Sequence, residues 1–112
     1  MNDSSQPISI GWSTTPTRND AESISHALVD KGLIACAQIT GPVTSIYRWK
    51  GKVEDEEYRV IFKFASHKEG EVRDALQELH PYDVPQWIVT HADTGHPEYA
   101  SWVHDSTFDD SP

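Results

Sequence analysis

Residues 33–51 read LIACAQITGPVTSIYRWKG and give the clearest indication of how this chain folds. It is long, β-branched and aromatic, which favours a strand. Gly41-Pro42 interrupts it and predicts a bulge or bend at a sheet edge. Lys50-Gly51 then offers a tight turn, after which YRVIFKFA (58–65) alternates between two sides. One side carries Tyr58, Val60, Phe62 and Phe64, and the other carries Arg59, Ile61 and Lys63. The pattern predicts a long antiparallel hairpin.

A strand and a helix precede this hairpin. ISIGWST (8–14) is short and partly β-branched and is bounded by Pro16, which indicates a strand. Residues 17–32 begin with Thr17 and Asp20 in a spacing like that of a capping box, and they end at Gly32, a typical C-terminal stop. Apolar residues recur between them at helical spacing, so we expect a helix with one buried face.

A second helix, a fourth strand and a short final helix follow the hairpin. Residues 66–80 place Ser66 and Glu69 in capping-box spacing, and the proline after His80 should end the helix there. QWIVTHA (86–92) predicts the fourth strand. Pro97 suits the first turn of a helix that presents Tyr99, Trp102 and Val103 on one side.

The predicted order is β-α-β-β-α-β followed by a short C-terminal helix. This is the α+β, ferredoxin-like split β-α-β arrangement, in which two helices cover one face of an antiparallel sheet. We expect residues 1–112 to form a single domain, because two cores do not fit into that length. Residues 1–6 and 106–112 are expected to be flexible tails.

Composition and charge restrict the classes of partner. Nine basic and eighteen acidic residues give a formal net charge of −9, so nucleic acids and anionic membranes would be repelled. The charge attracts cations or basic partners, although it serves equally to keep a small protein soluble. The chain opens without a secretory pattern, and no apolar run could span a bilayer. A lone cysteine, Cys36, fits a reducing compartment, so we expect a cytoplasmic protein.

Few residues suggest chemistry. There is no phosphate loop, nucleophile elbow or zinc-protease motif. Cys36 has apolar neighbours and is expected to be a buried, inert thiol. Lys63 lies in an apolar strand and needs a carboxylate or a route to solvent, but Glu57 is too far along the same strand to pair with it easily. His80, in LHPYDVPQ (79–86), is the best polar candidate, and the competing interpretation is that it caps the last helical carbonyls.

Several of these segments together resemble the CutA family, the divalent-cation tolerance proteins. The matching residues are Ala35-Cys36, Ser45, Tyr47, Trp49 and Gly51 at the hairpin tip, Glu57, Lys63, His80-Pro81-Tyr82 with Pro85, and Tyr99 with Trp102. The resemblance covers about residues 8–104. It implies a ferredoxin-like subunit in a homotrimer whose long hairpins reach neighbouring subunits, with Tyr47, Trp49 and Ile61 at the interface and partners for Glu57 and Lys63 near it.

The resemblance also implies tolerance of copper and other divalent ions. Ligands proposed in the family are a cysteine at the end of the first strand, the histidine of H-P-Y, and an acidic residue after V-P. This chain matches only the second, His80, because Ser13 and Gln86 occupy the other two positions. A neutral hydroxyl and a neutral amide are poorer metal ligands than a thiolate and a carboxylate. We therefore expect weak binding of Cu(II) or another divalent cation, and no certain cofactor.

The resulting expectation is a non-enzymatic homotrimer that responds to metal ions. A first alternative is a trimeric scaffold or signalling module that binds a protein or a small metabolite between subunits and has no metal function. A second is an enzyme that uses His80 and Tyr82, which we disfavour because neither a nucleophile nor a paired acid and base accompanies them in the sequence.

Overall fold

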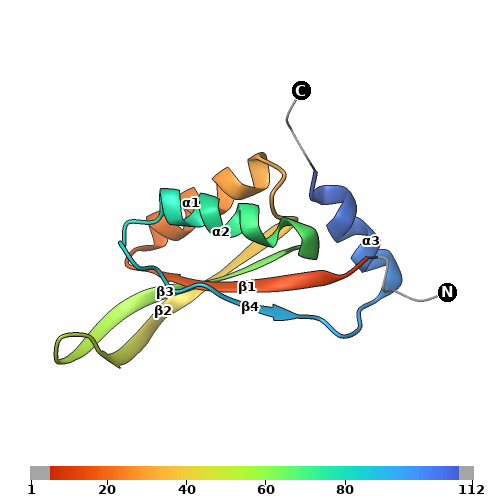
Figure 1. The fold of residues 1–112 in the computed structure, drawn as a ribbon. Helices are drawn as coiled ribbons and strands as arrows, with labels where there is room; N and C mark the ends of the chain where they lie inside the picture. Colours follow the sequence, from red (N-terminus) through yellow and green to blue (C-terminus); the bar gives the residue numbers. More distant parts are fainter. Residues whose placement is uncertain (1–5, 109–112) are drawn as a thin grey trace.

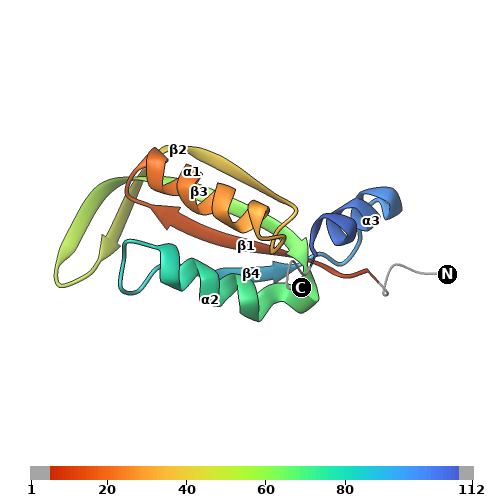
Figure 2. The same ribbon diagram turned by 90° about the horizontal axis from the view of Figure 1, so that it is seen from above.

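The computed structural model describes residues 6–108, which form a four-stranded antiparallel sheet with two helices on one face (Figure 1). The strands are β1 (Ile8–Thr15), β2 (Cys36–Arg48), β3 (Lys52–Ala65) and β4 (Ile88–His91), in the spatial order β2-β3-β1-β4. The helices are α1 (Arg18–Asp30), α2 (Glu69–Leu79) and α3 (Pro97–Ser106). Figure 2 shows α1 and α2 side by side over the sheet, with α3 at its end. The predicted element order and α+β class are confirmed.

The ends of α1 are those that the sequence predicts. The Thr17 hydroxyl accepts a hydrogen bond from the Asp20 amide at 3.0 Å and donates one to the Asp20 carboxylate at 2.9 Å. Gly32 follows the helix with a φ of +71°, a left-handed conformation that favours glycine. The Phe108 amide donates to the Gly32 carbonyl at 2.7 Å, so this turn also fixes the end of the described chain.

The start of α2 differs from the prediction. A short 3-10 turn (Ser66–Lys68) precedes the helix, and Lys68 occupies the cap position without a side-chain hydrogen bond. The Ser66 hydroxyl instead lies 2.7 Å from the Ser9 hydroxyl on β1. The expected capping box is therefore wrong, because Ser66 hydrogen-bonds to a strand that is distant in sequence. The helix ends at Leu79, and His80 is extended, as expected for a residue before proline.

The long hairpin is confirmed, including its irregular point. β2 and β3 pair from Cys36 with Lys63 to Arg48 with Lys52, and the register shifts between Thr40 and Val43, where Gly41-Pro42 lies. The tip turns through Lys50 and Gly51, both with positive φ. Figure 1 shows the outer half of the hairpin extending beyond both helices and bending away from them. The helices of the described chain therefore leave this half of the hairpin uncovered.

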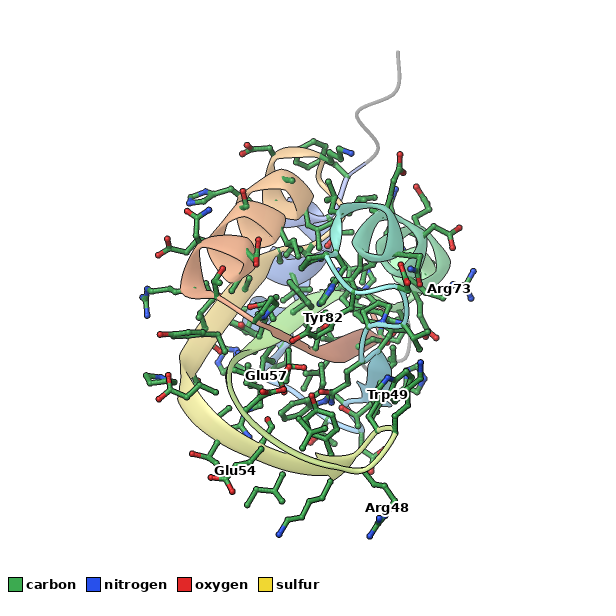
Figure 3. All side chains as sticks on the ribbon, turned by 90° about the vertical axis from the view of Figure 1, so that its left-hand side faces the viewer. Arg48, Trp49, Glu54, Glu57, Arg73 and Tyr82 are labelled. Carbon is green, nitrogen blue, oxygen red and sulfur yellow. The ribbon has the colours of Figure 1, made fainter. Side chains whose placement is uncertain are left out.

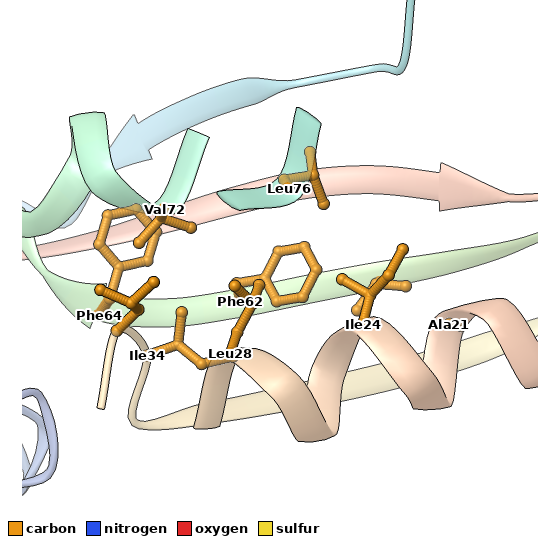
Figure 4. Close-up of a cluster of buried hydrophobic side chains, with 10 residues drawn as sticks. Ala21, Ile24, Leu28, Ile34, Phe62, Phe64, Val72 and Leu76 are labelled. Carbon is orange, nitrogen blue, oxygen red and sulfur yellow. The ribbon is translucent and has the colours of Figure 1, made fainter. Parts of the chain in front are cut away.

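The core lies between the sheet and the two helices (Figure 4). Phe62 and Phe64 of β3 are fully buried, and they meet Leu28 of α1 and Leu76 of α2 in one cluster. Trp87, just before β4, packs on both phenylalanine rings, with centroids 6.3 and 6.2 Å away. The alternation of residues 58–65 thus selects the face that the helices cover.

The opposite sheet face, called here the open face, is defined by Ile10, Trp12, Ile61, Lys63 and Ile88, which pair across β1, β3 and β4. α3 covers only one end of the sheet, where Ala100 and Val103 pack with Ile8 and Ala35. Ile88 remains 55% exposed, and Ile61 and Trp12 are half-buried. The open face is therefore mostly apolar, with Ile88 exposed and its other defining residues half-buried in the described chain.

Two further expectations need correction. Cys36 is half-buried rather than buried, because β2 is an edge strand. The tail from residue 106 is ordered at its start, since Ser106 ends α3 and Thr107 is buried with its hydroxyl donating to the Val103 carbonyl. The expected flexibility of residues 1–5 and 109–112 lies outside the described residues. Within residues 6–108, no helix is long and apolar enough to cross a bilayer.

Candidate functional site

His80 is held by both ring nitrogens. It is buried, and Nε2 donates to the Thr14 carbonyl of β1 at 2.7 Å, because a carbonyl can only accept. Nδ1 accepts from the Tyr82 amide at 3.0 Å. The expectation that this side chain caps the last carbonyls of α2 is therefore wrong, since the imidazole joins the turn to β1. A metal ion could reach Nδ1 only by displacing the Tyr82 amide.

Ser13 and Gln86 are in contact, but the contact is to the backbone of Gln86 and not to its side chain. The buried Ser13 hydroxyl donates to the Gln86 carbonyl at 2.8 Å, and the Gln86 residue itself is exposed. His80 hydrogen-bonds to the carbonyl of Thr14, the residue next to Ser13, so both contacts lie at the same end of β1. Within the described chain, no group of three or more His, Cys, Asp or Glu side chains is placed to hold a metal ion. The three candidate positions thus converge without forming a set of metal-binding side chains.

Glu57 and Tyr82 form a pair that sequence reasoning missed. Glu57 is only 6% exposed, and its Oε2 accepts a hydrogen bond from the Tyr82 hydroxyl at 3.0 Å. Burial, followed by this hydrogen bond and the Glu57 charge, raises the pKa of the Tyr82 phenol well above its usual range. The phenol is therefore neutral at physiological pH and acts as a hydrogen-bond donor, which makes it unsuitable as a base.

A second tyrosine on the hairpin is held in a similar way. The Tyr47 hydroxyl donates to Asp55 Oδ2 at 2.6 Å. This hydrogen bond, with a smaller contribution from burial and the charges of Asp55 and Glu57, raises the pKa of Tyr47 to about 12. Both tyrosines thus stay protonated and each satisfies one oxygen of a carboxylate.

A cleft of about 730 Å³ lies between the hairpin and the turn after α2. In Figure 3 the hairpin curves round this space, with Glu57, Trp49 and Tyr82 on its inner side, whereas Glu54 and Arg48 point outward. The lining residues combine aromatic rings, carboxylates and small polar groups: Thr14, Ser45, Ile46, Tyr47, Trp49, Glu57, Pro81, Tyr82, Asp83, Val84 and Gln86. Among these described residues there is no lysine, arginine or histidine.

The Glu57–Tyr82 hydrogen bond can be tested by titration. Burial, then the Glu57 hydrogen bond and the Glu57 charge, raise the pKa of Tyr82. The part of the stability that comes from this bond is therefore fully present below about pH 10, where an unfolded tyrosine ionises, and is lost as the pH rises through the folded pKa. We expect Glu57→Gln to lower the pKa of Tyr82, measured by tyrosinate absorbance with Tyr82→Phe identifying the signal. An unchanged late-ionising signal in Glu57→Gln would contradict the assignment.

Comparison with known proteins identifies the fold and the family. The model of the CutA1 divalent ion tolerance protein family matches residues 9–106. The chain belongs to this family. It is 37% identical over 95 residues to the divalent-cation tolerance protein CutA of Thermus thermophilus, covering 84% of this chain and 92% of that protein. It is 36% identical over 101 residues to Protein CutA of Mus musculus, of which it spans only 57%, while the match covers 89% of this chain.

Solved structures of CutA proteins have the same fold as this chain. The solved structure described as the periplasmic divalent cation tolerance protein CutA from Archaeoglobus fulgidus superposes with a TM-score of 0.87 at 29% sequence identity, covering 90% of this chain and 99% of that one. The resemblance inferred from the hairpin and the H-P-Y segment is therefore confirmed as CutA family membership.

The remaining CutA-like positions are placed as follows. Lys63 is half-buried on the open face, with Nζ 3.5 Å from the Tyr99 hydroxyl and 5.7 Å from that ring's centroid. Of the two possibilities expected for it, a carboxylate partner or a route to solvent, no carboxylate partner lies within residues 6–108, and its contact with Tyr99 is exposed. Tyr47 and Trp49, expected at a subunit interface, are 39% and 58% exposed in the single chain. Tyr47 and Trp49 of the outer hairpin, together with Glu57 of β3, line one cleft with Pro81 and Tyr82 of the H-P-Y turn.

Proposed function

We propose that this CutA family member takes part in the response to divalent metal ions as a homotrimer, that it is not an enzyme, and that it binds Cu(II) weakly. The observation that carries the proposal is the state of His80, whose two ring nitrogens are already hydrogen-bonded. Copper must compete with the Tyr82 amide for Nδ1, and its neighbours at Ser13 and Gln86 offer no charged ligand.

The homotrimer is supported by the uncovered surfaces. The open face exposes Ile88, and the hairpin exposes Ile46, Tyr47 and Trp49. An apolar surface of this kind is typical of a contact between proteins. Three copies related by a threefold axis would bury the same patches in three identical contacts.

The absence of enzymatic activity is proposed from the chemistry of the described site. Tyr82 is held as a neutral phenol, and His80 has no nucleophile as a hydrogen-bond partner. The net charge of −9 disfavours nucleic acid and anionic membrane as partners. We place the protein in the cytoplasm, and cell fractionation tests this, since recovery in a periplasmic fraction would contradict it.

Copper calorimetry tests the metal proposal. We expect weak binding to the wild type that fades below about pH 6, because a protonated imidazole cannot be a ligand. Ser13→Cys with Gln86→Glu should raise the affinity by adding a thiolate and a carboxylate, and adding His80→Ala should remove most of that gain.

The controls separate a site from diffuse attraction. Cation binding that comes only from the acidic surface would be unchanged in His80→Ala. It would be lost at high ionic strength, because exposed charges are screened beyond about 8 Å at physiological salt. Tight binding of one copper per subunit, kept by His80→Ala at high salt, would contradict the proposal.

A second candidate function is a trimeric scaffold or signalling module that binds a protein or a small metabolite at clefts between subunits and has no metal function. The cleft of about 730 Å³ favours it, because ligand sites are commonly clefts of this size. An identical thermal midpoint with and without copper would favour this candidate over metal binding.

A further inference from the structure

Glu57 presents an incompletely paired carboxylate to the cleft. It is 6% exposed and lines the cleft, and its only hydrogen bond recorded within the described chain comes from the neutral Tyr82 hydroxyl to Oε2. No ion pair joins it to any residue from 6 to 108. Burying an ionised carboxylate is costly unless the charge is paired. Oε1 is therefore a position at which a cation would be stabilised.

The surroundings of Glu57 favour a cation that also has an apolar surface. Tyr47, Trp49 and Tyr82 line the same cleft, and the faces of aromatic rings attract cations. Asp83 lines the cleft as well, and the carboxylate of Asp55 lies next to it, since it accepts a hydrogen bond from the lining residue Tyr47. No lysine, arginine or histidine of residues 6–108 lines the cleft, so no basic side chain of the described chain is placed there to compete for this position.

The geometry favours an organic cation over a metal ion. A divalent metal needs several oxygen, nitrogen or sulfur ligands at once, and no group of three or more such acidic, histidine or cysteine side chains exists within residues 6–108. An organic cation needs fewer charged partners, because its N–H groups can donate to one carboxylate while its carbon framework lies against aromatic rings.

We propose that the cleft binds a small organic cation carrying a guanidinium or primary ammonium group, which donates to Glu57 and packs on the rings of Tyr47 and Trp49. This inference rests on the second candidate function, a ligand held in the cleft, and gives that ligand a chemical class. A cleft of about 730 Å³ is large enough for a small molecule.

The test uses full-length protein and three probes that share a butyl chain: butylguanidinium, butylammonium and butyrate. NMR follows the Trp49 indole N–H, assigned by its loss in Trp49→Leu. We expect both cations to shift this signal saturably and butyrate to leave it unchanged. Guanidinium should bind more tightly, because it is planar and weakly hydrated and stacks on aromatic rings. No saturable shift with either cation, or an equal shift with butyrate, would overturn the proposal.

A matched pair of variants locates the binding. Glu57→Gln keeps the shape and removes the charge, so cation affinity should fall at least tenfold. Glu54→Gln removes an exposed carboxylate of the same hairpin that points away from the cleft, and should change affinity less than twofold (Figure 3). Equal losses would mean diffuse attraction and would overturn the proposal. Should Glu57→Gln not fold, Trp49→Leu replaces it, with calorimetry of butylguanidinium as readout at a concentration where light scattering gives the wild-type mass, because Trp49 is also expected at a subunit contact. Unchanged affinity would then overturn the proposal.

Two further arms separate this inference from the proposals above. Glu57→Gln should bind copper with the same affinity as the wild type in calorimetry. The copper proposal at His80 can therefore fail without affecting the organic-cation proposal, and the reverse also holds. The basic residues Arg48 and Lys52 of the tip are exposed, and another copy could place them in the cleft. Binding of butylguanidinium to Arg48→Ala/Lys52→Ala but not to the wild type would overturn the small-molecule proposal while leaving the homotrimer intact.

Discussion

Phe62→Ala is expected to lower the free energy of unfolding by about 3–5 kcal/mol, the usual loss when a large buried aromatic is removed from a core. Phe62 is fully buried, lies in the main core cluster and contacts Trp87 (Figure 4). Its removal leaves a cavity between β3 and the two helices that rigid neighbours cannot fill completely. Urea unfolding followed by circular dichroism measures the change.

The control for this prediction is Val29→Ala. Val29 lies on α1 and is 40% exposed, so the same kind of truncation should cost less than about 1 kcal/mol. Equal effects of the two substitutions would mean that the cluster round Phe62 does not dominate the stability of the subunit.

Ile61→Asp is expected to convert the assembly into single chains at micromolar concentration. Light scattering of the wild type should give three times the 12.6 kDa of one chain, and the variant should give one chain mass. Ile61 lies on the open face, where assembly would bury it, and an unpaired charge buried there costs about 3–5 kcal/mol per contact. Trp49→Ala should weaken assembly by about 2 kcal/mol.

Val29→Asp supplies the matched control for assembly. It adds the same charge at a residue that is 40% exposed on α1, on the other side of the sheet, and the mass should stay that of the wild type. A wild-type mass of one chain would contradict the homotrimer, and a trimeric Ile61→Asp would place the contact elsewhere.

The fold was predictable because its signals are local. The alternation of residues 58–65 selects the buried face of β3, and Thr17 and Gly32 mark the ends of α1 within a few residues. Ser66 shows where local reasoning ends. Its spacing to Glu69 is correct for a cap, but a hydroxyl on β1, 57 residues away in sequence, takes the hydrogen bond.

The candidate site was predictable only in part. His80 was found because a histidine at a helix end before a proline stands out locally, but its acceptor, the Thr14 carbonyl, is 66 residues away. Glu57 was noticed only for its distance from Lys63 along the strand and for its place in the CutA pattern, and its partner Tyr82 lies 25 residues further on. Pairings of this length depend on how the hairpin curves, which no local pattern records. Cys36 was misjudged for the same reason, since its exposure depends on β2 lying at an edge.

That edge has a consequence for aggregation. β2 runs for 13 residues, and β3 occupies only one of its sides, so the other side presents unpaired amide and carbonyl groups to any strand that arrives. Long unprotected edges of this kind template the addition of further chains. A subunit held monomeric by Ile61→Asp should therefore become more prone to form β-rich aggregates on gentle heating, even with its core intact. Self-association of the native protein would then reduce its tendency to form fibres.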